Sequence, residues 1–435
     1  MIRSAAMNRH RLARLAAGLG VLVAVAGLGC GGGDSDKPDA GPAGACVGTY
    51  SQAFPSEDDP QFCMYPWDTE KPALALTECD EVLENCSNTG ATPDFSCLTM
   101  PIEHPATPAT VTLTGYVDVF SSGPDADGAR VQVFREADLD GVTDIDTVTP
   151  IATFDVILDI ATLAGARACP SERDLEGDER FGQGRCALPD NDCTGECDKA
   201  LDAVSFCHDT TCDDLQRWEV AYSIPNLPTN EFLVIRTVGL DGAGNPEVLN
   251  NTWSPLIQYN TFFGAGDAPC SSTAECDAFG LDAVCSDCID TTVDPPIYRG
   301  DVNLLSSQDY LTIPTSAGLS GGVRPGNGGL AGEIHDCNSV RVRHAQVGFE
   351  KDRDPEVLVF FNGNPVKTLP RLQQINDGTN LLGLYSFLDI TPGTFSVVGV
   401  GVHEGALFET NRFSAHVWPD SVTLVRLGGG RPAQE

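Results

Sequence analysis

The chain carries an internal repeat, and this repeat constrains the fold more than any other feature of the sequence. Its first copy is Tyr222-Ser-Ile-Pro-Asn-Leu-Pro with Phe232 following, and its second is Tyr385-Ser-Phe-Leu-Asp-Ile-Thr-Pro with Phe395 following. In both copies a strand that starts Tyr-Ser runs into a proline turn, and an aromatic residue opens the next strand ten positions after the tyrosine. The pattern predicts one unit of β-structure that occurs twice.

A second pair of matching segments lies upstream of the tyrosines. Gly115-Tyr-Val is followed by Ala129-Arg-Val-Gln-Val-Phe, and Gly332-Glu-Ile is followed by Ala345-Gln-Val-Gly-Phe. Gly115 and Tyr222 are 107 positions apart, whereas Gly332 and Tyr385 are 53 apart, so the first copy is longer by 54 residues. That excess matches a cysteine-rich, acidic stretch at about 165–215, which we interpret as an insertion held in shape by disulfides. This structured insertion is either a recognition surface or an addition to the sandwich that has no binding role.

Short alternating segments fill the rest of the first copy. Apolar and polar residues alternate well enough to predict strands at 111–120 and 129–134, with Ala129, Val131 and Val133 on one face. Further strands are predicted at 150–157, 218–224 and 232–238. The 45 glycines and 29 prolines, with charged residues only a fifth of the chain, favour many short strands over long surface helices.

The repeat resembles a known family. The order Gly-x-Val, Ala-x-Val, Tyr-x-apolar and then a turn such as Thr391-Pro-Gly-Thr-Phe resembles the carboxypeptidase regulatory-like, transthyretin-like β-sandwich, and Asn226-Leu-Pro-Thr keeps the proline but lacks the glycine. The resemblance covers about 108–262 and 296–428. It implies an accessory or binding module that carries no catalytic residues.

We therefore expect an all-β protein of two Ig/transthyretin-like β-sandwiches plus disulfide-rich segments. The expected organisation is a lipoprotein signal peptide (1–30), a flexible tether (31–45), a cysteine-rich N-terminal module (46–107), the first β-sandwich (108–262) with its insertion (165–215), a cysteine-rich linker (263–295) and the second β-sandwich (296–435).

The first thirty residues have the pattern of an export signal. Arginines occur only up to Arg14, residues 15–28 are apolar or glycine, and Gly29-Cys30 ends the run. Fourteen residues make a helix of about 21 Å, too short to span a bilayer comfortably. Gly27-Leu-Gly-Cys30 resembles a bacterial lipoprotein lipobox, although it lacks the leucine three positions before the cysteine. The resemblance implies acylation of Cys30 and sorting to the outer membrane; an ordinary signal cleaved without lipid is the alternative.

The charge of the chain excludes one class of partner. The formal net charge is −36, and removing the four leader arginines leaves 22 basic against 62 acidic residues, or −40. Such a field repels nucleic acid and anionic membrane surfaces and favours cations and basic partners. A solvated acidic surface that keeps an exported protein soluble is the plainer interpretation.

Sixteen cysteines remain when Cys30 is set aside, and an even number in an exported chain predicts disulfides. The pairs Cys285/Cys288 and Cys193/Cys197 also have the spacing of zinc ligands, which is the less favoured alternative. Cys337 stands alone; if the clusters of six and four pair internally, its partner is one of the first five. The sixteen are Cys46, Cys63, Cys79, Cys86 and Cys97, then Cys169, Cys186, Cys193, Cys197, Cys207 and Cys212, then Cys270, Cys276, Cys285 and Cys288, and finally Cys337.

The sharpest local constellation of ligand atoms is acidic. Asp138, Asp140, Asp144 and Asp146 stand at nearly alternate positions around Gly141, so their carboxylates could converge on calcium. The segment departs from the EF-hand pattern at its first and twelfth positions, and a plain acidic turn is the alternative.

Two further motifs do not carry chemistry. Gly318-Leu-Ser-Gly-Gly matches the letters of a hydrolase nucleophile elbow, but the glycine- and proline-rich residues after it cannot form the helix that the elbow needs. His335-Asp-Cys337 is interpreted as a strand end beside a disulfide. The late aromatics, among them Phe395, Phe413 and Trp418, are expected in the core of the second sandwich, with carbohydrate stacking by one of them as the alternative.

The sequence thus predicts a structural or binding lipoprotein of the cell envelope, anchored in the outer membrane by lipid and facing the periplasm or the exterior. We expect no catalytic residues and no nucleic-acid partner; calcium is a candidate ligand, and the partner is an unidentified envelope protein or polysaccharide. The alternative is an enzyme, or an accessory subunit of one, that acts on envelope polysaccharide or peptide.

Overall fold

The computed structural model describes residues 52–56, 59–64, 72–80, 85–99, 110–120, 126–157, 166–169, 217–263, 288–290, 293–300, 302–338, 340–350, 357–360 and 378–428. All of them belong to a single compact unit, residues 44–435. The leader with Cys30, the tether, and most of the insertion and of the linker lie outside the described residues. No helix among the described residues has both the length and the apolar character needed to cross a membrane.

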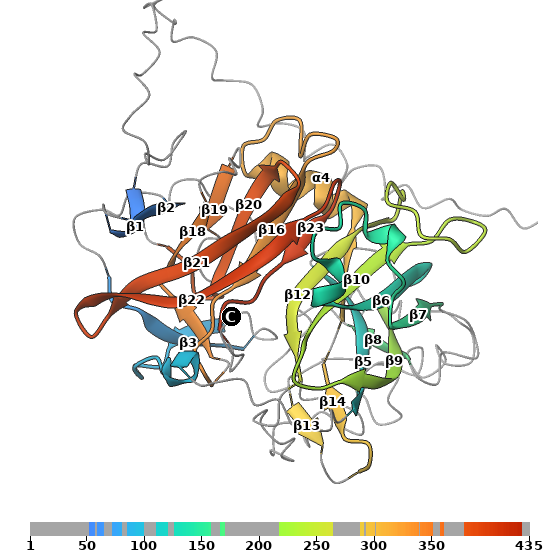
Figure 1. The fold of residues 1–435 in the computed structure, drawn as a ribbon, viewed down its shortest axis with the longest axis horizontal. Coiled ribbons are helices and arrows are strands. Elements are labelled where there is room, and N and C mark those ends of the chain that lie inside the picture. Colours follow the sequence, from blue (N-terminus) through green and yellow to red (C-terminus); the bar gives the residue numbers. More distant parts are fainter. Residues whose placement is uncertain are drawn as a thin grey trace, which may run out of the picture. The chain divides into compact units, whose positions relative to one another are not determined.

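Strands dominate the described chain (Figure 1). The N-terminal module contributes β1 (Gln52–Ser56), β2 (Asp59–Met64), β3 (Ala75–Asp80), β4 (Asn85–Asn88) and η1 (Ser96–Thr99). The first copy of the repeat contributes β5 (Thr110–Phe120), β6 (Ala129–Arg135), η2 (Glu136–Leu139), η3 (Ile145–Thr147), β7 (Ala152–Val156), β8 (Ala166–Cys169), β9 (Arg217–Pro228), β10 (Phe232–Gly239), β11 (Trp253–Ser254) and β12 (Leu256–Phe262).

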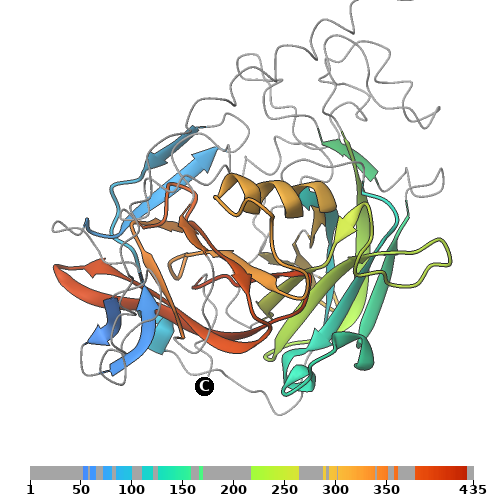
Figure 2. The ribbon, with the colours of Figure 1, turned by 90° about the horizontal axis from the view of Figure 1, so that it is seen from above.

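The remaining elements run to the end of the second copy. They are β13 (Cys288–Asp290), β14 (Ile297–Arg299), β15 (Val302–Ser306), α4 (Ser307–Ser316), β16 (Gly328–Glu333), β17 (Arg341–Arg343), β18 (Gln346–Glu350), β19 (Val357–Phe360), β20 (Leu384–Ile390), β21 (Gly393–His403), β22 (Ala406–Val417) and β23 (Val422–Leu424). Helix α4 follows β15 directly and packs against β15 and β11 (Figure 2).

The predicted strands of the first copy are confirmed. β5, β6, β7, β9 and β10 fall on the five predicted segments with small differences at their ends. Ala129, Val131 and Val133 lie together in the core of the first sandwich, because alternate residues of a strand point to the same face.

The two copies of the repeat have the same strand pairing. In the first copy β9 pairs antiparallel with one edge of β5 and β14 pairs parallel with the other, while β6, β10 and β12 form the facing sheet. In the second copy β20 and β23 flank β16 in the same senses, and β18, β21 and β22 form the facing sheet. The predicted duplication of a β-sandwich is confirmed.

The residues that revealed the repeat in the sequence are cross-strand partners in the structure. Gly115 pairs with Tyr222, and Gly332 pairs with Tyr385. Each tyrosine hydroxyl reaches over the glycine strand and donates to the carbonyl oxygen of the residue that follows the next strand: Tyr222 to Gly300, after β14, at 2.5 Å and Tyr385 to Val425, after β23, at 2.8 Å.

The glycine is what leaves room for this bridge. A Cβ atom on Gly332 would lie 1.8 Å from the carbonyl oxygen of Val425 and 2.8 Å from the hydroxyl of Tyr385. Because a side chain at this position would collide with both atoms, glycine is required at position 332, where Tyr385 passes over. We call this arrangement, made by Gly332, Tyr385 and Val425 and by Gly115, Tyr222 and Gly300, the tyrosine bridge.

Strand β23 joins the two sandwiches into one sheet. It pairs parallel with β16 on one side and parallel with β12 of the first copy on the other, so an eight-stranded sheet runs β19-β20-β16-β23-β12-β10-β6-β7 (Figure 1). The amide of Val422 donates to the carbonyl of Pro255 at 3.0 Å. Beyond β23 the side-chain amide of Asn260 both donates to and accepts from the backbone of Arg426, which continues the pairing past the last ladder residue.

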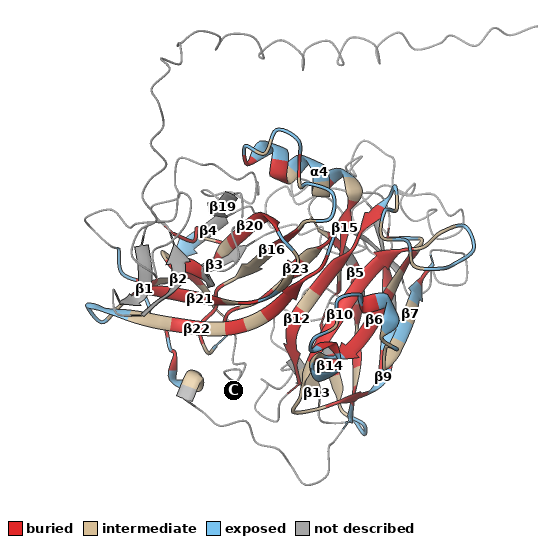
Figure 3. Cartoon of the chain, turned by 45° about the horizontal axis from the view of Figure 1, so that its top comes forward, coloured by how far each residue is buried: buried red, intermediate tan, exposed pale blue. Residues whose placement is uncertain are grey.

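Strands β6, β10 and β12 of this shared sheet are buried on both faces. Val133, Leu233 and Ile235 face the core of the first sandwich, whereas Phe134 and Val234, on the opposite face of the same strands, belong to the core of the second. Figure 3 shows β10 and β12 buried over nearly their whole length. Both faces of these strands are buried because the second copy covers the outer face of the first sandwich.

The N-terminal module also takes part in this packing. β2 pairs with β18 and β3 pairs with β17, and Leu74, Leu76 and Phe95 lie in the core of the second sandwich. β14 and β15, although they lie after the boundary expected at residue 296, pair with β5 of the first copy.

Candidate functional site

The loop between β6 and β7 covers the outer face of the shared sheet. Two short helices, η2 and η3, flank the turn at Gly141, where φ is +68°. Leu139 and Ile145 anchor the loop, because each is at most 5 % exposed and belongs to the core of the second sandwich. The acidic side chains between these anchors are thereby held at the surface.

A buried arginine lies beneath this loop. Arg236 of β10 is 1 % exposed, and its Nη1 donates to Oδ1 of Asp146 at 2.5 Å and to Oε1 of Gln132 on β6 at 3.1 Å. Its Nε is buried and makes no hydrogen bond with any described residue. The cost of burying the guanidinium charge is offset by Asp146, whose own side chain is 45 % exposed.

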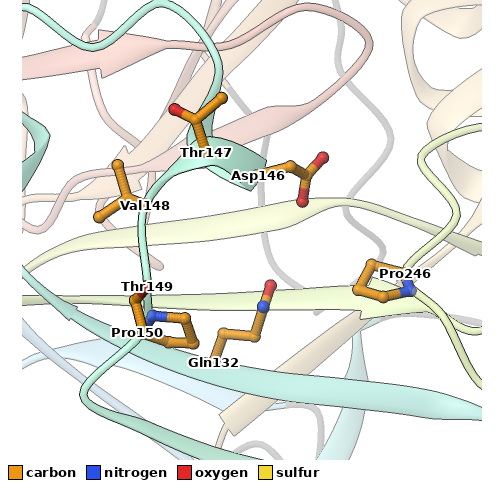
Figure 4. Close-up of a pocket in the computed structure, with 7 residues that line it drawn as sticks. All are labelled: Gln132, Asp146, Thr147, Val148, Thr149, Pro150 and Pro246. Carbon is orange, nitrogen blue, oxygen red and sulfur yellow. The ribbon is translucent and has the colours of Figure 1, made fainter.

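Two hollows lie in the surface on either side of Asp146. The first, of about 480 Å³, is lined by the chain from Asp146 to Pro150 together with Gln132 and Pro246 (Figure 4). The second, of about 320 Å³, lies between the loop and the turn that joins β22 to β23. Asp144, Asp146 and Arg236 line it from the first copy, and Trp418, Asp420 and Ser421 line it from the second.

Figure 4 shows how the first hollow is built. The amide of Gln132 projects from β6 on the side of the hollow where the carboxylate of Asp146 lies, and Pro246 closes the far side. Asp146 lines both hollows, whereas its partner Arg236 lines only the second.

The four expected calcium ligands lie on one loop but have separate roles. Asp144 accepts the backbone N–H of Asp146 at 3.0 Å and so caps η3, Asp146 pairs with Arg236, and Asp138 and Asp140 are exposed. In the part of the chain that the structure describes, no three histidine, cysteine, aspartate or glutamate side chains are grouped so that they could hold a metal. Calcium binding at these residues stays a prediction.

The glycine-rich loop after α4 has the structure that its composition predicts. Ser320 lies in a turn, and no helix follows it before β16 begins at Gly328. The loop is held by Asp389, 2 % exposed, which accepts from Arg324 Nε at 2.6 Å and from Asn327 Nδ2 at 2.9 Å. The residues around Ser320 therefore form a structural loop, and the elbow interpretation is excluded.

A charged cluster lies beside the second tyrosine bridge. Glu333 accepts a hydrogen bond from Nε2 of His335 at 2.6 Å and lies 3.7 Å from Nη2 of Arg341. Burial raises the pKa of Glu333, but the His335 hydrogen bond and the positive charge of Arg341 outweigh burial and hold that pKa well below its usual range. Burial, with a smaller contribution from Glu333, raises the pKa of Tyr385 well above its usual value. The cluster thus keeps Glu333 ionised and Tyr385 neutral.

The expected bridge from Cys337 is confirmed. Cys337 forms a disulfide with Cys97, 240 residues earlier and one of the five N-terminal cysteines. Cys337 lies in a turn four residues after β16 ends at Glu333, which agrees with the expectation that His335-Asp-Cys337 follows a strand beside a disulfide. Of Cys63, Cys79, Cys86, Cys169 and Cys288 the structure describes the backbone; Cys46, Cys186, Cys193, Cys197, Cys207, Cys212, Cys270, Cys276 and Cys285 lie outside the described residues.

Sequence reasoning did not identify Arg236 or Gln132. One signal was present, because Arg236 is a charged residue in the otherwise apolar stretch from Phe232 to Val238, and a charge in a buried strand needs a partner. The aromatics expected in the core are there: Phe395, Phe413 and Trp418 are each 2 % exposed.

Comparison with known proteins assigns no family to the chain. No family model matches it, and no curated protein does either. Among solved structures, it is similar to the Bacillus anthracis TIE protein (10 % identity, TM-score 0.14, 74 % of this chain and 34 % of that chain). It therefore spans about a third of the length of that protein.

Two pilin structures are also similar. They are the minor pilin GBS52 of Streptococcus agalactiae (8 % identity, TM-score 0.15, 75 % of this chain and 97 % of that one) and a mutant of the shaft pilin SpaA of Lactobacillus rhamnosus GG (9 % identity, TM-score 0.17, 74 % and 99 %). These similarities are too weak to assign a family. What the structure itself defines is an all-β protein of two sandwiches that share one sheet.

Proposed function

We propose that this chain is a non-catalytic structural or recognition protein of the bacterial cell envelope, exported and anchored through lipid on Cys30. The observation that carries the proposal is the Cys97–Cys337 disulfide, which joins the N-terminal module to the second sandwich across 240 residues. Disulfides of this kind persist in oxidising compartments outside the cytoplasm. Together with the apolar leader that ends at Cys30, the disulfide supports an extracytoplasmic location.

The shared sheet can serve as a rigid scaffold for the loop between β6 and β7. Because β23 pairs with strands of both copies, the two sandwiches are continuous through backbone hydrogen bonds and are not joined by a linker alone. The loop with its two hollows lies over this sheet and is anchored by buried residues. Binding residues are commonly held on loops that a rigid scaffold positions.

The family resemblance and the calcium hypothesis are finer parts of the same proposal. The carboxypeptidase regulatory-like pattern supports a binding module, and the acidic loop with Asp138 and Asp140 at its exposed turn supports a role for a cation. Calorimetric titration of the purified protein with calcium, compared with a variant that carries Asp140→Ala and Asp144→Ala, tests the cation: binding that the variant loses supports it, and equal heats contradict it.

Fractionation of cells that express the full chain tests the location and the anchor. Labelling with a palmitate analogue should mark the wild-type protein in the outer membrane, and a Cys30→Ala variant should lose both the label and the membrane association. A non-reduced peptide map should recover Cys97 linked to Cys337. A cytosolic product with free thiols at these positions would contradict the proposal.

The partner can be sought directly. A pull-down from detergent-extracted membranes with the tagged full chain should recover an envelope protein or polysaccharide. A basic partner is favoured by the mature charge of −40, which follows from 22 basic and 62 acidic residues.

A further inference from the structure

We propose that this chain is a substrate of a thiol–disulfide isomerase in the compartment to which it is exported, and that the isomerase moves Cys97 from an incorrect partner to Cys337. The inference rests on the proposed function for the oxidising location alone. The observation that carries it is the Cys97–Cys337 bridge, which joins residues 240 positions apart. Ten cysteines lie between the two ends of this bridge, and four others of the sixteen precede it.

The surroundings of Cys97 are made by residues that come much later in the chain. The carbonyl of Asp94 accepts the N–H of Cys337 at 2.7 Å, and the N–H of Asp94 donates to Oδ2 of Asp336 at 3.2 Å. Between Asp94 and Cys97, the ring of Phe95 is 7 % exposed and lies in the core of the second sandwich. Nothing in this list can form before the second copy is present, so Cys97 has no fixed position until then.

The N-terminal module as a whole depends on the second copy in the same way. β3 pairs with β17, and β2 pairs with β18. Among the described strands, β1 pairs only with β2 and β4 only with β3. A hairpin of two strands is at best marginally stable by itself. The module therefore cannot hold Cys97 away from other thiols while the rest of the chain is still being exported.

Incorrect partners are much closer to Cys97 along the chain. Cys86 lies 11 residues before it, whereas Cys337 lies 240 residues after it. Because the probability of closing a flexible loop falls as the 3/2 power of its length, the ratio of these lengths favours the short loop about 100-fold. The N-terminal part of a chain also becomes available first. Early oxidation should therefore join Cys97 to a nearby cysteine.

The exchange that corrects this bond needs no net oxidation. A thiolate of the isomerase attacks the sulfur of Cys97 in its bond with Cys86; that bond breaks, and the sulfur of Cys86 leaves as a thiolate and takes up a proton. The thiolate of Cys337 then attacks the sulfur of Cys97 in the mixed disulfide, which forms the native bond and releases the isomerase thiolate. The proton that Cys337 gives up balances the one that Cys86 takes up.

Refolding of residues 31–435, which hold the sixteen cysteines other than Cys30, tests the inference. The reduced, unfolded chain is returned to native conditions in a glutathione buffer with a catalytic amount of disulfide isomerase, or with the same isomerase after its active-site cysteines are replaced by serine. Non-reduced peptide maps of alkylated samples follow the partner of Cys97 with time. Cleavage at Glu84 and at Asp94 separates Cys79, Cys86 and Cys97 into different peptides.

With the inactive isomerase, early samples should contain Cys97 bonded mainly to nearby cysteines. The active isomerase should shorten the half-time for the Cys97–Cys337 bridge by about tenfold or more, because reshuffling of disulfides without a catalyst is slow.

Two double variants test the loop argument without the active isomerase. Cys79→Ser with Cys86→Ser leaves Cys63, 34 residues before Cys97, as the nearest competitor, so the advantage of the short loop falls to about 20-fold and the native bridge should form about fivefold faster. Cys207→Ser with Cys212→Ser also removes two cysteines, but the first of them lies 110 residues after Cys97, and the rate should not change.

The inference is overturned if the native bridge forms equally fast with active and inactive isomerase, or if Cys97 is found only free or bonded to Cys337 at early times. The comparison of the two isomerases uses the natural cysteines, so it decides the matter even if a variant does not fold. Failure here is distinct from failure of the proposed function. If the cellular protein is lipidated in the outer membrane with its native bridge while refolding ignores the isomerase, the proposed function stands and the inference does not.

Discussion

Replacing Gly332 by alanine should break the connection between the two sandwiches. The new Cβ would lie 1.8 Å from the carbonyl oxygen of Val425, whereas real Cβ atoms keep at least 3.0 Å from other heavy atoms. The obstacle is backbone and cannot rotate away, so β23 must move by more than 1 Å from β16. The same movement withdraws the carbonyl that Tyr385 bonds at 2.8 Å.

The cost of Gly332→Ala can be worked from these contacts. Overpacking of a dense interior costs about 1–3 kcal/mol, and a lost buried hydrogen bond adds about 1 kcal/mol. We therefore expect the free energy of unfolding to fall by about 2–4 kcal/mol, a large part of the ~5–15 kcal/mol of a typical domain.

Urea denaturation followed by tryptophan fluorescence, with the disulfides intact, measures this cost. Gly321→Ala is the matched control, because no atom lies within 4 Å of the added Cβ, and its effect should stay within about 0.5 kcal/mol. Tyr385→Phe removes the hydroxyl alone and should cost about 1–2 kcal/mol. A loss below about 1 kcal/mol for Gly332→Ala would refute the steric argument.

The other predictions follow from the same structure. Tyr222→Phe should lower the free energy of unfolding by about as much as Tyr385→Phe in the same urea assay, ~1–2 kcal/mol, since both hydroxyls make the tyrosine bridge. If Tyr222→Phe leaves that free energy unchanged, the tyrosine bridge does not stabilise the first copy as it does the second. The pKa of Glu333 is lowered from 4.5 in the folded protein, so its stabilising contribution is present above that value and is lost as the pH falls below it. Thermal melts should show the difference between wild type and Glu333→Gln shrinking below pH 4.5, and a constant difference would contradict this. Replacing Cys97 and Cys337 together by serine should lower the free energy of unfolding by about 3–5 kcal/mol without changing secondary structure by circular dichroism, and no loss would show that the bridge is dispensable.

The duplicated unit could be predicted because its signature is local. Gly115 and Tyr222, like Gly332 and Tyr385, occur in short segments with a fixed order, and the structure makes each pair direct cross-strand partners. In the second copy a Cβ atom at Gly332 would lie 2.8 Å from the hydroxyl of Tyr385, which explains why the glycine accompanies the tyrosine there.

The shared sheet could not be predicted in the same way. β23 is three residues long, Val422–Leu424, and its pairing with β12 joins positions about 166 residues apart, as between Leu256 and Val422. Parallel pairing over such a distance leaves no turn and no register signal in the sequence.

The disulfide and the candidate site could also be predicted from the sequence only in part. Counting the cysteines pointed to a partner for Cys337 in the N-terminal group, but choosing Cys97 required the backbone approach at Asp94, whose carbonyl accepts the N–H of Cys337. The carboxylates of the loop were visible in the sequence, whereas the fact that Asp146 faces Arg236 depends on how β10 lies under the loop.

Hydrogen exchange of the β23 backbone tests the central claim, that the two copies share one sheet, most directly. The amide of Val422 donates to Pro255 of the first copy, and the amide of Val425 donates to Ala331 of the second. Mass spectrometry of peptides that cover 421–427 should place these amides among the slowest to exchange, together with those of β10. Rapid exchange in 421–427 while β10 and β20 stay protected would show that the sandwiches fold without the shared strand, and would contradict the account.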